Sequence, residues 1–264
     1  RRLRLMGVMA DHDYSEELRI AVEATRAAGD EVARMRREGL RYGHKDGREL
    51  VSEADIRAAE MLHAALTAAF PSDGWLSEEH TDTAERLGRE RAWVVDPIDG
   101  TREFLMGVPE YAVSVALVVR GEPVLGVVYN PAAEDLQAAV CTDSAEDPAG
   151  LLPSHFTVLV GRNEKRWNEV PPLPRGAKTT AVGSVAYRLS RLAGGHGDAC
   201  LSGYGRAEWD VAAGVVLCKA AGFRVTDVLG HPMRFNQPDP YVAGLLIAKP
   251  ALHGVLDQWF RRLR

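Results

Sequence analysis

The chain has 264 residues, of which 46% are hydrophobic and 26% charged, the composition of a globular protein with an ample core. It carries 37 acidic and 32 basic side chains, so its net charge is −5. This balance lacks the basic surface typical of a protein that binds a nucleic-acid polymer. No apolar run approaches the roughly 18 residues needed to span a bilayer, so we expect no membrane partner either.

The cysteines and the start of the chain bear on location. Cys141, Cys200 and Cys218 are scattered and odd in number, without the spacing of a disulfide framework or a zinc site. We therefore expect a reducing, cytoplasmic location. The basic N-terminal segment has too short an apolar stretch for a signal peptide, and we expect the native protein to begin at Met6 or Met9.

Hydrophobic periodicity and turn residues divide the first part of the chain into elements. They predict, in chain order, a helix over 14–37, a loop over 39–48, a helix over 53–70, a strand ending at Asp99, and a hairpin of strands 112–119 and 123–129. Ser52 and Asp55 fit a capping box at the start of the second helix.

Strands and helices continue to alternate in the second part. The predicted elements are a strand over 156–161, a helix over 185–193, a strand over 198–201, a helix over 210–221, strands over 223–227 and 244–248, and a helix over 250–263. Asp, Pro and Gly residues around residue 150 indicate a boundary between an N-terminal α+β half, 1–150, and a C-terminal α/β half, 151–264. This pattern predicts a layered α/β fold rather than a bundle or an all-β sandwich.

The most informative segment is the run Trp93 to Thr101. Three apolar residues lead into Asp96-Pro97-Ile98-Asp99-Gly100-Thr101. Two carboxylates at the end of a strand can supply oxygen ligands to a hard cation, and the Gly-Thr step can turn backbone N–H groups toward an anion. Metal plus phosphate is therefore one hypothesis. A simple acidic turn is the other, because Asp, Pro and Gly are the usual turn residues.

Two further acidic segments stand at element boundaries. Glu78-Glu79 follows the turn after the second helix, and Asp210 opens a later helix. Acids delivered from three boundaries could converge on two cations, which at roughly 3.5–4 Å apart clamp the attacking and leaving oxygens of a displacement at phosphorus. Each also has a simpler interpretation, since Asp210 suits an N-cap and the glutamates suit a solvated pair.

Together, Glu78-Glu79, Asp96 to Thr101 and Trp209-Asp210, with Ser52 and Asp55 upstream, resemble the signature of the inositol monophosphatase superfamily. Its members are magnesium-dependent, lithium-sensitive phosphomonoesterases. The resemblance implies the layered alternating α/β sandwich of the inositol monophosphatase/fructose-1,6-bisphosphatase type. The N-terminal half would carry most metal ligands, and the C-terminal half the last ligand and the substrate contacts.

The resemblance also implies a metal site. Glu78, Asp96, Asp99 and the backbone carbonyl of Ile98 would bind one Mg²⁺, and Asp210 would join Asp96 and Asp99 at a second. The resemblance implies about two or three Mg²⁺ ions per site. The residue types agree, since this metal prefers carboxylate, carbonyl and water oxygens.

The remaining implied roles concern the substrate and the attacking water. Thr101 and Asp55 would orient and deprotonate a metal-activated water. Gly100 and Thr101 would offer backbone N–H groups to the phosphate, with Glu78 and Asp210 also beside the substrate. The partner is then a small phosphorylated molecule. A homodimer is a further expectation, because dimers are common in the family.

Three departures separate the chain from the inositol-hydrolysing branch. Thr101 is followed by Arg102-Glu103-Phe104 instead of Asn-Phe, and Ser77 precedes Glu78 instead of Gly. Gly203 stands where that branch has a glutamate that holds sugar hydroxyls. These departures, Glu208 and the segment 233–240 resemble the 3'(2'),5'-bisphosphate nucleotidase branch.

That branch implies removal of the 3'-phosphate of 3'-phosphoadenosine 5'-phosphate. Arg102, Arg206 and Arg234 are candidates to bind its second phosphate, and Tyr204 or Phe235 to stack on its base. The alternatives are an inositol, sugar or histidinol phosphate as substrate. From another functional class, the chain could be a catalytically silent binding protein of the same fold.

Overall fold

The computed structural model of the chain describes residues 2–7, 13–45, 49–141 and 153–263. Its helices are α1 (Ser15–Glu38), α2 (Glu53–Ala69), the 3-10 helix η1 (Ala84–Gly88), α3 (Thr101–Leu105), α4 (Arg162–Arg166), α5 (Val185–Ala193), α6 (Glu208–Ala220) and α7 (Pro250–Arg261). Its strands are β1 (Arg2–Gly7), β2 (Tyr42–Lys45), β3 (Glu49–Ser52), β4 (Gly74–Ser77), β5 (Arg91–Asp99), β6 (Ala112–Val119), β7 (Glu122–Asn130), β8 (Asp135–Val140), β9 (Phe156–Gly161), β10 (Ala177–Val182), β11 (Ala199–Ser202), β12 (Arg206–Ala207), β13 (Arg224–Thr226), β14 (Tyr241–Val242) and β15 (Leu245–Ala248).

Two large sheets organise the molecule. The first has the order β1-β8-β7-β6-β5-β4, and the second has the order β10-β9-β11-β15-β13. The strands of each sheet come from one side of residue 150, and the predicted boundary itself lies outside the described residues. Within the first sheet β4 runs parallel to β5 and β1 parallel to β8, while the other neighbours are antiparallel.

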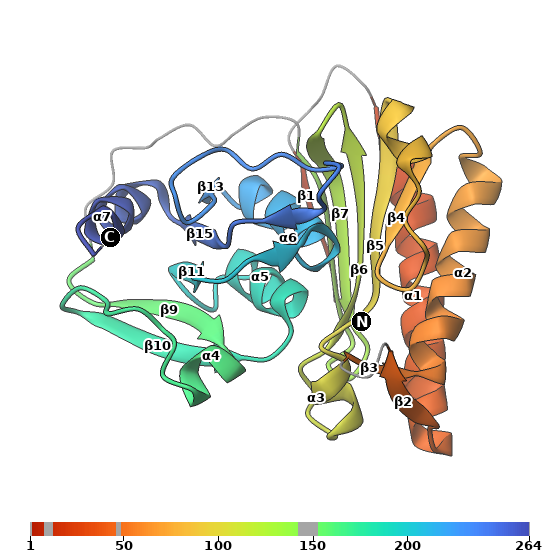
Figure 1. Ribbon diagram of the computed structural model, residues 1–264, viewed down its shortest axis with the longest axis horizontal. Coiled ribbons are helices and arrows are strands. Elements are labelled where there is room, and N and C mark those ends of the chain that lie inside the picture. The colour runs from red at the N-terminus through yellow and green to blue at the C-terminus, as the bar shows by residue number, and fades with distance from the viewer. Residues whose placement is uncertain (1, 8–12, 46–48, 142–152, 264) are drawn as a thin grey trace.

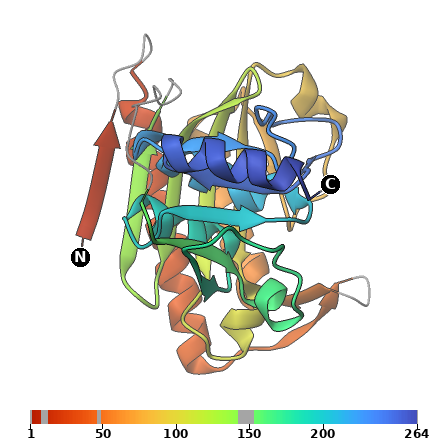
Figure 2. The ribbon, with the colours of Figure 1, turned by 90° about the vertical axis from the view of Figure 1, so that its left-hand side faces the viewer.

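Helices and sheets alternate in five layers. Helices α1 and α2 cover one face of the first sheet, α5 and α6 lie between the two sheets, and α7 lies on the outer face of the second sheet (Figure 1). Figure 2 shows α7 from that outer side, with the strands of the second sheet behind and below it. One apolar cluster runs through α5, α6 and both sheets, so the two sheets share a core. The predicted layered α/β sandwich is confirmed.

The start of α2 follows the predicted capping box. Ser52 N–H donates to Asp55 Oδ2 at 2.8 Å, and Ala54 N–H donates to Ser52 Oγ at 3.2 Å. Both donors are among those that a helix leaves unsatisfied at its first turn. The box fixes where Asp55 lies, and this carboxylate also belongs to the site described below.

Three expectations about the elements need correction or qualification. The segment 39–48 is not a loop throughout, because β2 pairs with β3 as an antiparallel ribbon. Helix α6 begins at Glu208, so Asp210 lies in its first turn and is not its N-cap. Met6 lies within β1 and Met9 lies outside the described residues, so the expected start of the native protein stays a prediction. Within the described ranges, no helix is long and apolar enough to cross a bilayer.

Candidate metal centre and substrate pocket

The end of β5 places two aspartates on one side of the strand. In a regular strand, residues three apart face opposite sides. Here the pairing with β6 shifts between Asp96, opposite Ser114, and Asp99, opposite Ala112, so one extra residue is accommodated. Pro97 lies inside this bulge, where the missing N–H is tolerated. The bulge explains why the Asp-Pro-Ile-Asp spacing can direct both carboxylates to one site.

Neighbouring elements bring the other acids to the same edge. Because β4 runs parallel to β5 with Ser77 opposite Val95, Glu78 emerges beside Asp96. Asp210 arrives from the first turn of α6. That turn is tied to β6 by the Ser114 hydroxyl, which donates to the carbonyl of Trp209 at 3.2 Å.

The resulting cluster is crowded with negative charge. Carboxylate oxygens of Asp96, Asp99 and Asp210 lie within 4.8 Å of one another. Burial, followed by repulsion from Glu78 and Asp99, raises the pKa of Asp96 well above its ordinary value. Burial and the charges of Asp99 and Glu78 do the same to the pKa of Asp210. Like charges this close cannot all ionise without a compensating cation.

Asp99 is anchored at the N-terminus of α5. Its Oδ2 accepts the Ser184 hydroxyl at 2.5 Å and the Ala186 backbone N–H at 2.5 Å. Burial raises the pKa of Asp99, while these two hydrogen bonds act in the opposite direction. Since both bonds use Oδ2, the other oxygen remains available to a ligand.

Thr101 and Asp55 form a pair beside the acids. The Thr101 hydroxyl is within hydrogen-bonding reach of Asp55 Oδ1 at 3.1 Å and of the Ile98 carbonyl oxygen at 3.0 Å. Burial raises the pKa of Asp55, and the hydrogen bonds from Ser52 and Thr101 oppose this effect. A buried carboxylate with a raised pKa suits proton transfer near neutral pH.

Gly100 forms the turn between strand β5, which ends at Asp99, and helix α3, which begins at Thr101. Its φ of 89° is in the left-handed region that glycine adopts readily. A Cβ at this position would meet the Glu110 carbonyl oxygen and Ser184 Cβ, each at 3.0 Å. The site therefore requires glycine here for both conformation and space.

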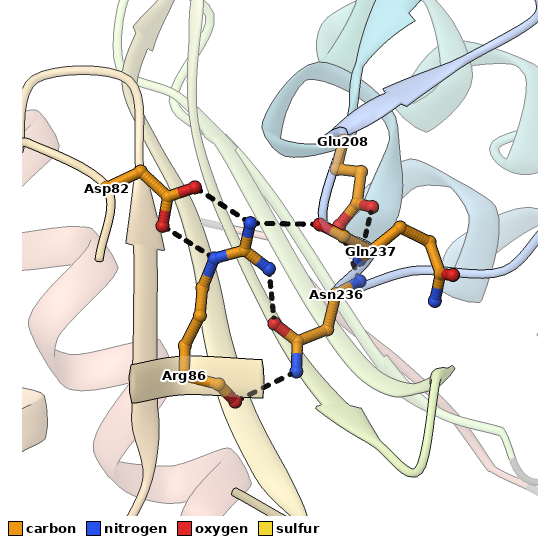
Figure 3. Close-up of polar contacts among 5 residues, drawn as sticks. All are labelled: Asp82, Arg86, Glu208, Asn236 and Gln237. Atoms are coloured by element: carbon orange, nitrogen blue, oxygen red, sulfur yellow. Dashed lines mark hydrogen bonds and ion pairs between the residues drawn. The ribbon is translucent and has the colours of Figure 1, made fainter. Parts of the chain in front are cut away.

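A buried polar cluster also holds the start of α6, in addition to the bond between Ser114 and Trp209 (Figure 3). The Arg86 side chain is 2% exposed; it binds both carboxylate oxygens of Asp82, at 2.6 and 2.8 Å, and Asn236 Oδ1 at 2.7 Å. Glu208 accepts the backbone N–H groups of Asn236 and Gln237 at 2.6 and 3.0 Å. We call these five residues the Arg86 clamp. It joins η1, the segment 233–240 and the helix that carries Asp210.

The acids open into one pocket of about 360 Å³. It is lined by Glu78, Asp96, Ile98, Asp99, Gly100, Thr101, Arg102, Glu103, Asn163, Trp167 and Asp210. Asn163 lies in the short helix α4, and Trp167 directly follows it. Neither residue was predicted from the sequence. A five-residue helix is too short for periodicity to reveal, so the only available signal was the tryptophan itself.

The remaining substrate candidates are placed differently. Arg206 lowers the pKa of Asp99 and Asp210, yet its guanidinium pairs with Glu164 at 2.7 Å. Arg234 pairs with Glu122, at the turn between β6 and β7, whereas Asp99 lies opposite the other end of β6. The structure does not bring Arg234 to the pocket.

The two aromatic candidates for base stacking also differ from expectation. Phe235 is fully buried in the apolar core between the sheets, so the prediction that it could stack on a base is wrong. Tyr204 is 48% exposed but is not among the residues that line the pocket.

The donor set fits a divalent cation of the magnesium type. Carboxylates dominate it, and no histidine or cysteine lies among the lining residues of the pocket, which all belong to the described part of the chain. The Ile98 carbonyl has a second lone pair besides the one that faces Thr101. Hard oxygen ligands of this kind suit Mg²⁺.

Comparison with known proteins agrees with this site. The model of the inositol monophosphatase family matches residues 13–262 of the chain. The chain is 34% identical over 230 residues to an inositol-1-monophosphatase of Mesorhizobium japonicum, covering 81% of this chain and 86% of that protein. It is 32% identical over 280 residues to a 3'-phosphoadenosine 5'-phosphate phosphatase of Mycobacterium leprae, covering 95% and 99%.

A solved structure shows the same fold. The extragenic suppressor protein suhB from Bartonella henselae superimposes with a TM-score of 0.76 at 24% identity, covering 93% of this chain and 98% of that one. The chain therefore belongs to the inositol monophosphatase family, a family of phosphatases.

Proposed function

We propose that the protein is a Mg²⁺-dependent phosphomonoesterase that removes the 3'-phosphate of 3'-phosphoadenosine 5'-phosphate. The observation that carries the chemistry is the convergence of Glu78, Asp96, Asp99 and Asp210 on one pocket. These carboxylates and the Ile98 carbonyl would hold the Mg²⁺ ions. When bound, Mg²⁺ supplies charge neutralisation at the phosphate and lowers the pKa of a water molecule.

The chain's own residues supply the rest of the chemistry. The Thr101 hydroxyl and Asp55 orient the attacking water and take its proton. The backbone N–H groups of Gly100 and Thr101 hold the phosphate oxygens. Water attacks phosphorus, the bond from phosphorus to the 3'-oxygen breaks, and a proton passes to that oxygen. The products are adenosine 5'-phosphate and inorganic phosphate, with no covalent phosphoenzyme.

Three features support a nucleotide as the substrate. The 3'-phosphoadenosine 5'-phosphate phosphatase of Mycobacterium leprae matches this chain over nearly its full length. Arg102, which replaces the asparagine expected of an inositol enzyme, lines the pocket and can pair with a second phosphate. Gly203 lacks the carboxylate that would hold sugar hydroxyls. Arg206 stays a candidate phosphate ligand if it exchanges Glu164 for the substrate.

A substrate panel tests the proposal. The purified protein with Mg²⁺, with and without Li⁺, is given 3'-phosphoadenosine 5'-phosphate, inositol 1-phosphate and histidinol phosphate, with Asp99→Asn as the control. We expect the highest kcat/KM for the bisphosphonucleotide, inhibition by Li⁺, and no activity in the variant.

Three results would contradict parts of this proposal. A preference for inositol 1-phosphate, to which the Mesorhizobium relative's name points, would overturn the substrate. Equal rates for wild type and Asp99→Asn would overturn the metal site. Absence of activity with every phosphomonoester would favour a silent binding protein.

A further inference from the structure

Trp167 is an exposed aromatic side chain on the wall of an acidic pocket. It is 55% exposed, and it lines the same pocket of about 360 Å³ as the four carboxylates. A pocket of this size lies within the range that holds small organic ligands, roughly 300–1,000 Å³. The pocket therefore combines several charged side chains with one exposed aromatic surface.

The indole ring of Trp167 is not tied to another group in the part of the chain that the structure describes. Within the described ranges, its side chain makes no hydrogen bond, ion pair or ring contact. By contrast, Trp93 donates to Asp73 at 3.0 Å and Trp259 to the Pro172 carbonyl at 2.9 Å. The backbone of Trp167 is nevertheless fixed, because its N–H donates to the Asn163 carbonyl at 2.9 Å at the end of α4.

We propose that the face of the Trp167 indole is the stacking surface for the nucleobase of the substrate. This inference rests on the proposed function and adds the residue that recognises the base. A phosphomonoester enters with its phosphate at the carboxylate end, so its organic group must lie along the remaining wall. An uncharged planar ring gains from contact with an indole, and it places no further negative charge beside the acids.

A cyclic polyol gains less from the same surface. Its hydroxyl groups require hydrogen-bond partners when they leave water, and an indole face supplies none. Among the residues that line the pocket, the uncharged polar side chains are Asn163 and Thr101. The Thr101 hydroxyl already lies within hydrogen-bonding reach of Asp55 and the Ile98 carbonyl. The wall therefore favours a nucleotide over an inositol phosphate.

Kinetics with matched variants tests the stacking role. Trp167→Ala, Trp167→Phe and the control Trp259→Phe are compared on 3'-phosphoadenosine 5'-phosphate and on glycerol 2-phosphate, which has no ring. For Trp167→Ala we expect the ratio of the two kcat/KM values to fall about tenfold, mainly through KM for the nucleotide. Trp167→Phe should restore most of the ratio, and Trp259→Phe should match wild type. An unchanged ratio in Trp167→Ala, or no rescue by phenylalanine, would overturn the proposal.

Fluorescence separates this inference from the proposed function. Adenosine 5'-phosphate should quench tryptophan emission in wild type and in Trp259→Phe, and the quenching should be lost in Trp167→Phe. If the wild type hydrolyses the bisphosphonucleotide but Trp167→Phe keeps the quenching, only the stacking assignment fails. If the wild type prefers inositol 1-phosphate, the proposed substrate fails, and loss of quenching in Trp167→Phe would still establish a base-binding surface.

Discussion

Glu208 Oε2 accepts the backbone N–H of Asn236 at 2.6 Å. Glu208 lies two positions before Asp210 on helix α6. This bond attaches the segment 233–240 to the helix that delivers the last carboxylate of the cluster. Glu208 and that segment were both features that suggested the nucleotidase branch. In the structure Glu208 and two residues of that segment, Asn236 and Gln237, belong to the Arg86 clamp, which holds the start of the helix that carries Asp210.

The first prediction concerns this bond. Glu208→Gln keeps one acceptor but turns an amide N–H₂ toward a backbone N–H, so one buried donor loses its partner. We expect a loss of about 1–3 kcal/mol in unfolding free energy, which lowers the melting temperature by several degrees. The Mg²⁺ concentration for half-maximal activity should rise several-fold, because Asp210 is less well held. Glu122→Gln, at a half-exposed surface pair, is the matched control and should change neither quantity.

A second prediction concerns the anchor of Asp99. Ser184→Ala removes the hydroxyl that donates to Asp99 and also accepts the Tyr187 backbone N–H at 3.0 Å as an N-cap. The lost cap should cost about 1 kcal/mol in stability, measured by chemical denaturation. The requirement for Mg²⁺ should rise as well. Ser190→Ala, buried on the same helix, serves as the control; an equal rise there would mean that general loosening of α5 is the cause.

The sequence predicted the longer helices α1, α2, α5, α6 and α7 and the strand that ends in Asp96 and Asp99, because their patterns are local. Helix 185–193 was predicted with the bounds that the structure shows, since its apolar face recurs at helical spacing. Strand β8, Asp-Leu-Gln-Ala-Ala-Val, was missed because it has few β-branched residues, although its centre is buried. The ribbon β2–β3 was missed because its residues are polar and glycine-containing.

The site was predictable only where a motif marked it. The carboxylates stand at element ends, and the family resemblance linked them across more than a hundred residues. Arg86 is 150 positions from Asn236, and no periodic pattern connects two such residues. The same holds for Ser184, which is 85 positions from Asp99. Contacts of this kind depend on how the layers pack, which one sequence does not reveal.

A third prediction follows from the raised pKa values in the acid cluster. A carboxyl whose pKa is raised by folding stabilises the protein most below its unfolded-state pKa, about 3.9 for aspartate. That stability is lost as the pH rises through the folded-state value. The metal-free protein therefore carries an increasing penalty from Asp96 as the pH rises from about 4 toward 8. Asp96→Asn cannot ionise and keeps the oxygen that accepts the Ile98 N–H at 3.0 Å.

Thermal unfolding in a chelator measures this penalty. We expect Asp96→Asn to melt a few degrees above wild type at pH 8, with the difference shrinking toward pH 5. Added Mg²⁺ should reverse the order at pH 8, since it binds the ionised cluster of the wild type. If Asp96→Asn were less stable than metal-free wild type at pH 8, the ionised Asp96 would not be destabilised by burial and by the neighbouring carboxylates, and the prediction would be wrong.

The last prediction isolates the hydroxyl of Thr101. Thr101→Val keeps the shape of the side chain and removes the group that reaches both Asp55 Oδ1 and the Ile98 carbonyl. Without it Asp55 cannot act on the attacking water through Thr101, and kcat should fall by about 10²–10⁴. In the proposed site the carboxylates and the Ile98 carbonyl bind Mg²⁺, so Mg²⁺ should still raise the melting temperature of the variant. Thr101→Ser, which keeps a hydroxyl, should retain most of the rate. If Thr101→Val were as active as wild type, the proton would have to reach Asp55 by another route.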